Sequence, residues 1–79
     1  MSGPLRVDPG ELSADEIIAA LNDGRRVLVT VEMLGQPHEI SLRYDGQQYY
    51  CDTHTRLHKH PEEREMRACI REMGYAEEE

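Results

Sequence analysis

Apolar residues recur at helical spacing near the start of the chain, in the segment LSADEIIAALNDG. Ser13 is followed three residues later by Glu16, which is the spacing of a capping box at a helix N-terminus. Gly24 stands where helices commonly end in a left-handed residue. The pattern predicts a helix that begins after the N-cap Ser13 and ends before Gly24, with one apolar face made of Ala14, Ile17, Ile18 and Leu21.

A second helical pattern lies near the other end of the chain. Pro61 suits the first helical position because it has no N–H group to leave unpaired, and the acidic residues after it favour the positive end of the helix dipole. Gly74 marks the end, and Tyr75 beyond it can contact Ile70, as in a Schellman motif. We predict a helix over residues 61–74, with an apolar stripe of Met66, Cys69, Ile70 and Met73.

Between the two helices the pattern changes to the alternation that is typical of strands. The segment RVLVTVEML, residues 26–34, is rich in β-branched residues. A second alternating run, EISLRY, covers residues 39–44, and a third, QQYYCD, covers residues 47–52. Three consecutive strands are therefore predicted.

The dipeptide Asp45-Gly46 separates the second and third strands. Such a dipeptide between two alternating runs is a strong signal for a two-residue type I′ hairpin loop. A loop of that length places Ile40 opposite Cys51, on the more apolar face of the sheet. The register therefore predicts that Cys51 points into the core.

These elements predict an α+β fold in the order α-β-β-β-α, a three-stranded antiparallel meander with both helices packed on one face. The 79 residues leave room for one hydrophobic core, so residues 1–79 form a single domain. Residues 1–11 show no periodicity and predict an irregular N-terminal arm. Residues 76–79 predict a frayed acidic tail.

Charge restricts the classes of partner. Sixteen acidic residues outnumber nine basic ones and give a net charge of −7, which argues against nucleic acid, because phosphate binding needs a basic surface. No apolar run is long enough to span a membrane. The first twelve residues lack the basic and apolar regions of a secretory signal, so we expect a cytoplasmic protein with reduced cysteines.

The residue usage is that of a salt-adapted protein. Eight of the nine basic residues are arginine, Phe and Trp are absent, and carboxylates are in excess. The segments YYCDT, RLHKHPEE, MRACI and GYA resemble an uncharacterised family of small acidic proteins from halophilic archaea. This resemblance covers most of the chain and implies no activity, cofactor or site residue.

One stretch, YYCDTHTRLHKH, raises the question of a metal site. Its spacing, C-x2-H-x3-H-x-H, offers four ligands suited to zinc, namely Cys51, His54, His58 and His60. It lacks the usual two ligand pairs separated by a longer loop. We favour one buried thiol beside loop histidines, with no cofactor, and keep a small zinc-binding module as the alternative.

The two cysteines also raise the question of a thiol-dependent enzyme. Cys69 lies on the apolar stripe of the last helix, where buried thiols are usually inert. No recognisable triad accompanies Cys51 or Cys69. We therefore expect a protein that is not an enzyme.

The sheet face away from the helices is the last feature. With both helices on one side, this face is uncovered and carries a mixture of apolar and polar residues. Such a surface can self-associate or dock a partner. The sequence thus predicts a non-enzymatic domain that acts through a protein interface, most simply as a homodimer, with interface candidates Leu28, Thr30, Leu34, Arg43 and Tyr50.

Overall fold

A computed structural model of the chain describes residues 3–53 and 56–76. The protein is an α+β structure, as predicted, but the sheet is larger than a three-stranded meander. In the described part of the chain the elements are β1 (Leu5–Val7), α1 (Ala14–Asn22), β2 (Val27–Met33), β3 (Gln36–Tyr44), β4 (Tyr49–Asp52), β5 (Leu57–His60) and α2 (Glu63–Glu72).

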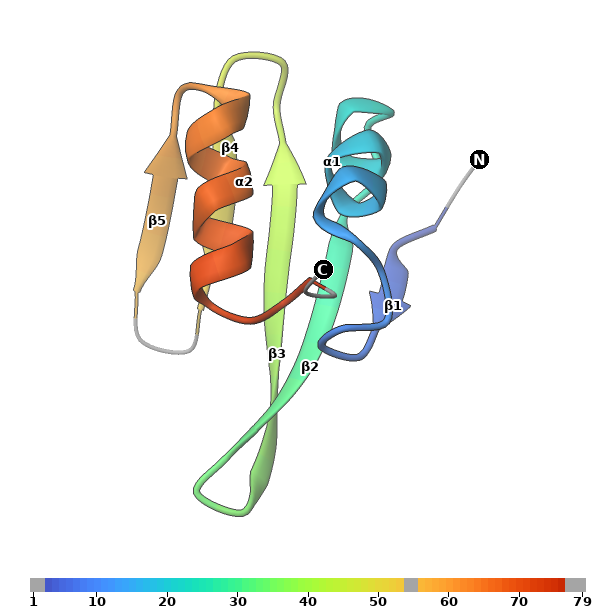
Figure 1. The fold of residues 1–79 in the computed structure, drawn as a ribbon, viewed down its shortest axis with the longest axis vertical. Coiled ribbons are helices and arrows are strands. Elements are labelled where there is room, and N and C mark those ends of the chain that lie inside the picture. Colours follow the sequence, from blue (N-terminus) through green and yellow to red (C-terminus); the bar gives the residue numbers. More distant parts are fainter. Residues whose placement is uncertain (1–2, 54–55, 77–79) are drawn as a thin grey trace.

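The strands form one mixed sheet in the order β1-β2-β3-β4-β5 (Figure 1). β1 runs parallel to β2, and every other neighbouring pair is antiparallel. Both helices lie on the same face of the sheet, α1 against β2 and β3, and α2 against β4 and β5. The prediction that both helices cover one face is confirmed.

Helix α1 begins and ends as its sequence predicts. The Ser13 hydroxyl accepts a hydrogen bond from the Glu16 N–H, and the Glu16 carboxylate accepts one from the Ser13 N–H, both at 3.1 Å. At the other end Gly24 has a φ of 85°, and the Arg25 N–H reaches the Ala20 carbonyl at 3.0 Å. These local bonds satisfy groups that a helix end leaves unpaired.

Helix α2 starts two residues later than predicted. Its N-cap is Glu62, so Pro61 lies before the helix rather than at its first position. Its C-terminus does form the predicted Schellman motif, since the Tyr75 N–H donates to the Ile70 carbonyl at 3.0 Å. Met73, predicted on the buried stripe, is 49% exposed because it caps the helix end.

The tightest turn of the sheet lies between β2 and β3. Met33 pairs with Gln36, which leaves a two-residue loop, Leu34–Gly35. Leu34 has a φ of 54° and Gly35 a φ of 77°, and a type I′ turn needs positive φ at both positions. The sequence predicted Leu34 as a strand residue and the type I′ turn at Asp45-Gly46, and both predictions are wrong.

The connection from β3 to β4 is longer than predicted. Tyr44 pairs with Tyr49, so the loop holds four residues, 45–48. Its Asp45 side chain organises the loop, because Oδ1 accepts the N–H groups of Gln47 and Gln48, each at 2.8 Å. This side-chain bonding competes with the short backbone turn that the dipeptide favours in isolation.

The longer loop moves the predicted register by two residues. Cys51 lies opposite Leu42 rather than Ile40. Because side chains alternate with a period of two, a shift of two leaves every residue on its predicted face. Cys51 is 0% exposed, so its predicted place in the core is confirmed.

Two short strands were missed. The predicted irregular arm contains β1, which adds to the edge of β2 with Leu5 beside Val27 and Val7 beside Val29. Strand β5 occupies part of the segment predicted as a histidine loop and pairs with β4, and between these strands the Thr53 N–H donates to the Arg56 carbonyl at 2.8 Å. At three and four residues, these strands are too short for alternation to reveal them.

The core lies between the sheet and the helices. Its fully buried side chains include Ile17 and Leu21 from α1 and Met66 and Ile70 from α2, each 0% exposed. Ala76, predicted in a frayed tail, is buried in this core at 4% exposure, while residues 77–79 lie outside the described part of the chain. Neither described helix has the length and apolar character needed to cross a membrane.

Candidate functional site

The sheet face opposite the helices, which we call the open face, carries side chains from all five strands. Among the described elements, no helix covers this face (Figure 1). On the strand positions of this face the charges come in equal numbers, with Arg6, Arg43 and Lys59 against Glu32, Glu39 and Asp52, and the loop residue Asp45 adds one carboxylate beside Tyr50. Since the chain as a whole has a net charge of −7, the acidic excess lies elsewhere on the molecule.

The open face carries an ordered pair of side chains close to the β3–β4 loop. Arg43 on β3 lies directly opposite Tyr50 on β4, and the Arg43 guanidinium carbon stands 4.1 Å from the centre of the Tyr50 ring, a cation–π contact. The Tyr50 hydroxyl donates to Asp45 Oδ2 at 2.7 Å, and this hydrogen bond raises the pKa of Tyr50. Arg and Tyr are among the residue types that most often anchor protein interfaces.

An ion pair covers another part of the open face, over β2. Arg6 on β1 bonds Glu39 on β3 and so reaches across β2. Leu28 on β2 lies beside Arg6 in the register and is only 6% exposed, so it is covered on a face that neither α1 nor α2 protects.

The structure therefore corrects the set of interface candidates. Thr30, Arg43 and Tyr50 do lie on the open face, with Thr30 exposed. Leu28 is on this face but is buried and cannot offer surface to a partner. Leu34 is 103% exposed, yet it lies in the β2–β3 turn and not on a strand face.

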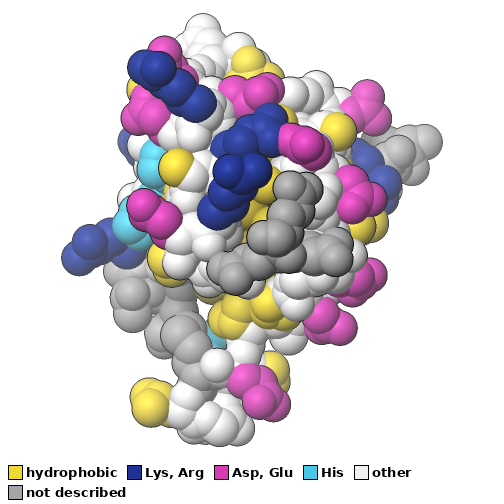
Figure 2. Space-filling view, in the orientation of Figure 1, with side chains coloured by type: hydrophobic (Ala, Val, Ile, Leu, Met, Phe, Trp, Pro, Cys, Tyr) yellow, Lys and Arg dark blue, Asp and Glu magenta, His cyan; other side chains and the backbone are white. Residues whose placement is uncertain are grey.

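A second group of functional side chains lies on the helix side, between β4, β5 and α2. We call it the thiol cluster: Cys51, Cys69, His58, His60 and Tyr75. Strand pairing places His58 directly opposite Cys51 and keeps His60 on the same face. Cys69 comes from α2, which packs on both strands, and it is partly exposed. Figure 2 shows histidine side chains at the surface along the β5 edge of α2.

The neighbours in this cluster shift the acidity of both thiols in opposite directions. Hydrogen bonding from the Cys51 thiol, helped by the imidazoles of His60 and His58, lowers the pKa of Cys69 to about 6. The same interaction with Cys69, together with burial, raises the pKa of Cys51. Burial and the neighbouring Cys51 raise the pKa of Tyr75. The cluster therefore favours one thiolate, on Cys69, beside one protonated thiol.

The structure brings together only part of the predicted zinc ligand set. Cys51, His58 and His60 share the core-facing side of the sheet, but His54 lies outside the described residues. Over residues 3–53 and 56–76, no three or more His, Cys, Asp or Glu side chains are arranged to hold a metal ion. Zinc binding stays a prediction, which metal analysis of untagged wild-type protein and a Cys51→Ala variant would test.

Cys69 and Tyr75 are the members of the cluster that the zinc hypothesis left out. A signal for Cys69 did exist, because helical periodicity directed it toward the sheet while strand register directed Cys51 toward the helices. The contact between Cys69 and Cys51 also depends on α2 lying over β4, and residue spacing alone does not specify that packing.

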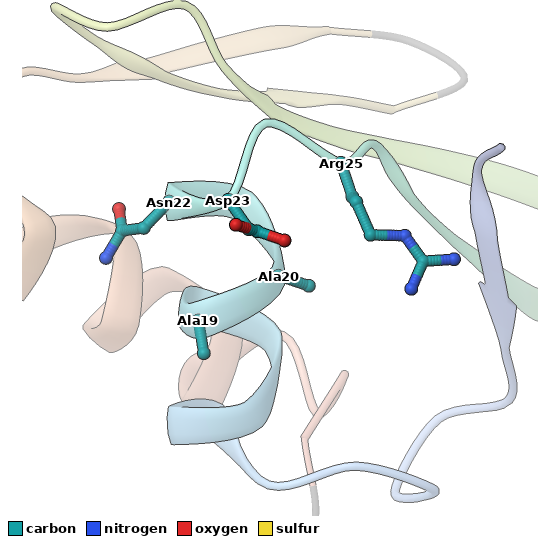
Figure 3. A pocket seen from close by; sticks show the side chains of 5 residues that line it. All are labelled: Ala19, Ala20, Asn22, Asp23 and Arg25. Carbon is teal, nitrogen blue, oxygen red and sulfur yellow. The ribbon is translucent and has the colours of Figure 1, made fainter. Parts of the chain in front are cut away.

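An open depression at the C-terminal end of α1 offers less chemistry. It is lined by Ala19, Ala20, Asn22, Asp23 and Arg25, and the side chains of Asn22 and Arg25 point apart (Figure 3). The Asn22 amide donates to Glu63 at 3.0 Å and accepts the Tyr49 hydroxyl, while Arg25 donates to the Gly3 carbonyl at 3.3 Å. These polar groups are used in holding the fold together.

The fold and the two groups of side chains define a small α+β protein with an open, charge-balanced sheet face and a thiol pair beneath its second helix. The chain belongs to a family of unknown function, DUF8001, whose model matches residues 1–78. Neither a curated protein nor a solved structure matches the chain. The prediction of an uncharacterised family is confirmed, and an origin in halophilic archaea stays a prediction.

Proposed function

We propose that this protein is a non-enzymatic interaction domain that associates with a second copy of itself through the open face. The observation that supports the proposal is the charge balance of the strand positions on that face in a chain with a net charge of −7. On the rest of the surface the acidic surplus makes two copies repel each other. Two open faces brought together add little to this electrostatic repulsion.

Self-association is favoured over a partner of another kind because the face is complementary to itself. A two-fold axis sets one patch against the same patch, so a basic residue of one copy can meet an acidic residue of the other. Along the strands, Arg43 and Lys59 lie at the end of the face near the β3–β4 loop, and Glu32 and Glu39 lie toward the β2–β3 turn. A small core also gains stability from the apolar surface that a dimer buries.

The proposed setting is a salt-adapted cytoplasm. Molar salt shortens the Debye length to about 3 Å, which screens the repulsion between two acidic chains outside the contact. Association should therefore strengthen from low salt to molar salt, because the repulsion spread over the whole surface is lost while the short contacts of the face remain.

Sedimentation velocity over a wide range of protein concentration in molar salt tests the proposal. We expect a reversible monomer–dimer equilibrium. Removing the guanidinium that lies over Tyr50, Arg43→Ala, should raise the dimer Kd by about tenfold or more, the effect of losing ~1.4 kcal/mol at an interface anchor.

Arg64→Ala is the matched control, since it removes the same group from α2, where the Arg64 side chain is 82% exposed. This variant should dimerise like the wild type. A wild-type chain that stays monomeric at the highest concentration reached, or an equal effect of Arg43→Ala and Arg64→Ala, would contradict an interface on the open face.

A further inference from the structure

The thiol cluster lies on the opposite side of the sheet from the open face, so its chemistry is independent of the proposed dimer. Its two sulfur atoms come from elements that pack directly on each other, Cys51 from β4 and Cys69 from α2. Both cysteines are free thiols. The question is what a thiol pair at the border of the core can do.

The two thiols differ in access. Cys51 is 0% exposed and is enclosed by Cys69 and the Tyr75 hydroxyl. Cys69 packs against the same core but is partly exposed at the α2–β5 border. A reagent from solvent therefore meets Cys69 first, and only Cys69 can deliver the reaction to Cys51.

The histidines favour reaction at Cys69. His60 stands beside it, and its Nε2 is buried with no hydrogen-bond partner among the described residues. An oxygen atom added to the Cys69 sulfur would bring a hydrogen-bond partner into this region. The lowered pKa of Cys69 adds to the argument, because the thiolate is the nucleophilic form.

We propose that Cys69 and Cys51 form a modification site for hydroperoxides, at which Cys69 is oxidised first and Cys51 then closes a reversible intramolecular disulfide between α2 and β4. In the first step the Cys69 thiolate attacks one peroxide oxygen, the O–O bond breaks, and the alkoxide or hydroxide takes up a proton. This step leaves a sulfenic acid on Cys69.

In the second step the Cys51 sulfur attacks the Cys69 sulfur, the S–O bond breaks, and the oxygen leaves as water with the proton of Cys51. The two thiols together lose two electrons, and the hydroperoxide is reduced to an alcohol (water, for hydrogen peroxide) plus water. A thiol reductant reverses the change by exchange at the disulfide.

The test treats reduced full-length protein with a small excess of hydrogen peroxide, blocks remaining thiols with N-ethylmaleimide, and measures the intact mass. We expect a monomer that is lighter than the reduced protein by two hydrogen atoms and carries no maleimide. After reduction and a second treatment with N-ethylmaleimide, the same protein should carry two maleimide groups. Peptide mapping should join Cys51 to Cys69. tert-Butyl hydroperoxide should give the same product.

Two variants identify the order of events. Cys51→Ala should accumulate sulfenic acid on Cys69, trapped by dimedone, and Cys69→Ser should stay unmodified at the same dose because Cys51 is buried. Circular dichroism checks that each variant is folded, and the wild-type measurement needs no variant at all. Wild-type protein that stays reduced, keeps a dimedone-reactive Cys69, or forms only intermolecular disulfides would overturn the proposal.

Discussion

Replacing the exposed Leu34 with asparagine should stabilise this protein. Leu34 has a φ of 54° in the β2–β3 turn, and its side chain is 103% exposed. The left-handed conformation costs a residue with an ordinary side chain roughly 1–2 kcal/mol, and asparagine tolerates it better than leucine. Since no buried contact is lost, Leu34→Asn should raise the free energy of unfolding by about 0.5–1 kcal/mol and create the Asn-Gly pair preferred in type I′ turns.

Urea denaturation at low protein concentration is the suitable assay, because urea adds no ions and dilution keeps the chain monomeric. Thermal unfolding gives a second readout, since for a domain of this size ~1 kcal/mol corresponds to a melting temperature change of about 4–8 °C. Leu57→Asn is the matched control: Leu57 is 44% exposed but lies on β5, where asparagine is disfavoured, so this variant should lose stability. If Leu34→Asn is no more stable than the wild type, the turn is not strained as described.

Three further outcomes are expected. Leu28→Ala should lower the free energy of unfolding by about 2 kcal/mol, although Leu28 lies on the open face, because it is 6% exposed; a change as small as that of an exposed leucine would refute its burial. The pKa of Asp45 is lowered to about 2 by the Gln48 N–H, the Tyr50 hydroxyl and the Gln47 N–H, so its stabilising effect is complete above the ordinary value of 3.8 and is lost as pH falls toward 2. Carboxyl chemical shifts should show this midpoint, and Tyr50→Phe should raise it. Finally, the unfolding midpoint should rise markedly between low and molar salt, and a flat response would contradict salt adaptation.

The helices could be predicted because their ends are encoded locally. The Ser13–Glu16 capping box and the glycine at position 24 act within a few residues, so their spacing is sufficient. Pro61 was placed two positions too far into the helix, because Glu62 has the extended backbone of the N-cap and the helix begins at Glu63.

The sheet was predicted in part because pairing depends on contacts between distant residues. Strand β1 is defined by its parallel pairing with β2, and the three residues of β1 contain no sequence signal for that pairing. The two-residue turn was predicted at Asp45-Gly46 but lies at Leu34-Gly35. Both dipeptides place glycine second, and the Asp45 side chain stabilises a longer loop. The faces were nevertheless correct, since the register moved by an even number of residues.

The candidate site shows the same limit. The inward direction of Cys51 followed from alternation, but the histidines at 58 and 60 could be assigned to its side only once β5 was known to pair with β4. The open face was predicted correctly as a surface, whereas the cover that Arg6 and Glu39 give to Leu28 required β1. Sequence patterns assign faces, and the neighbours across a face come from the tertiary structure.

The three residues of β1 have a consequence for solubility that goes beyond packing. Without them, β2 would be an edge strand along its whole length, and Val27 and Val29 would present unpaired backbone groups to the strands of other molecules. The strands that do stand at the edges are short, and each carries a basic side chain on its outer face, Arg6 on β1 and Lys59 on β5. Short, charged edges resist the strand-by-strand growth that leads to aggregates. The fold thus shields the first half of β2 from open-ended assembly, while residues 30–33 of β2 extend beyond β1 toward the turn.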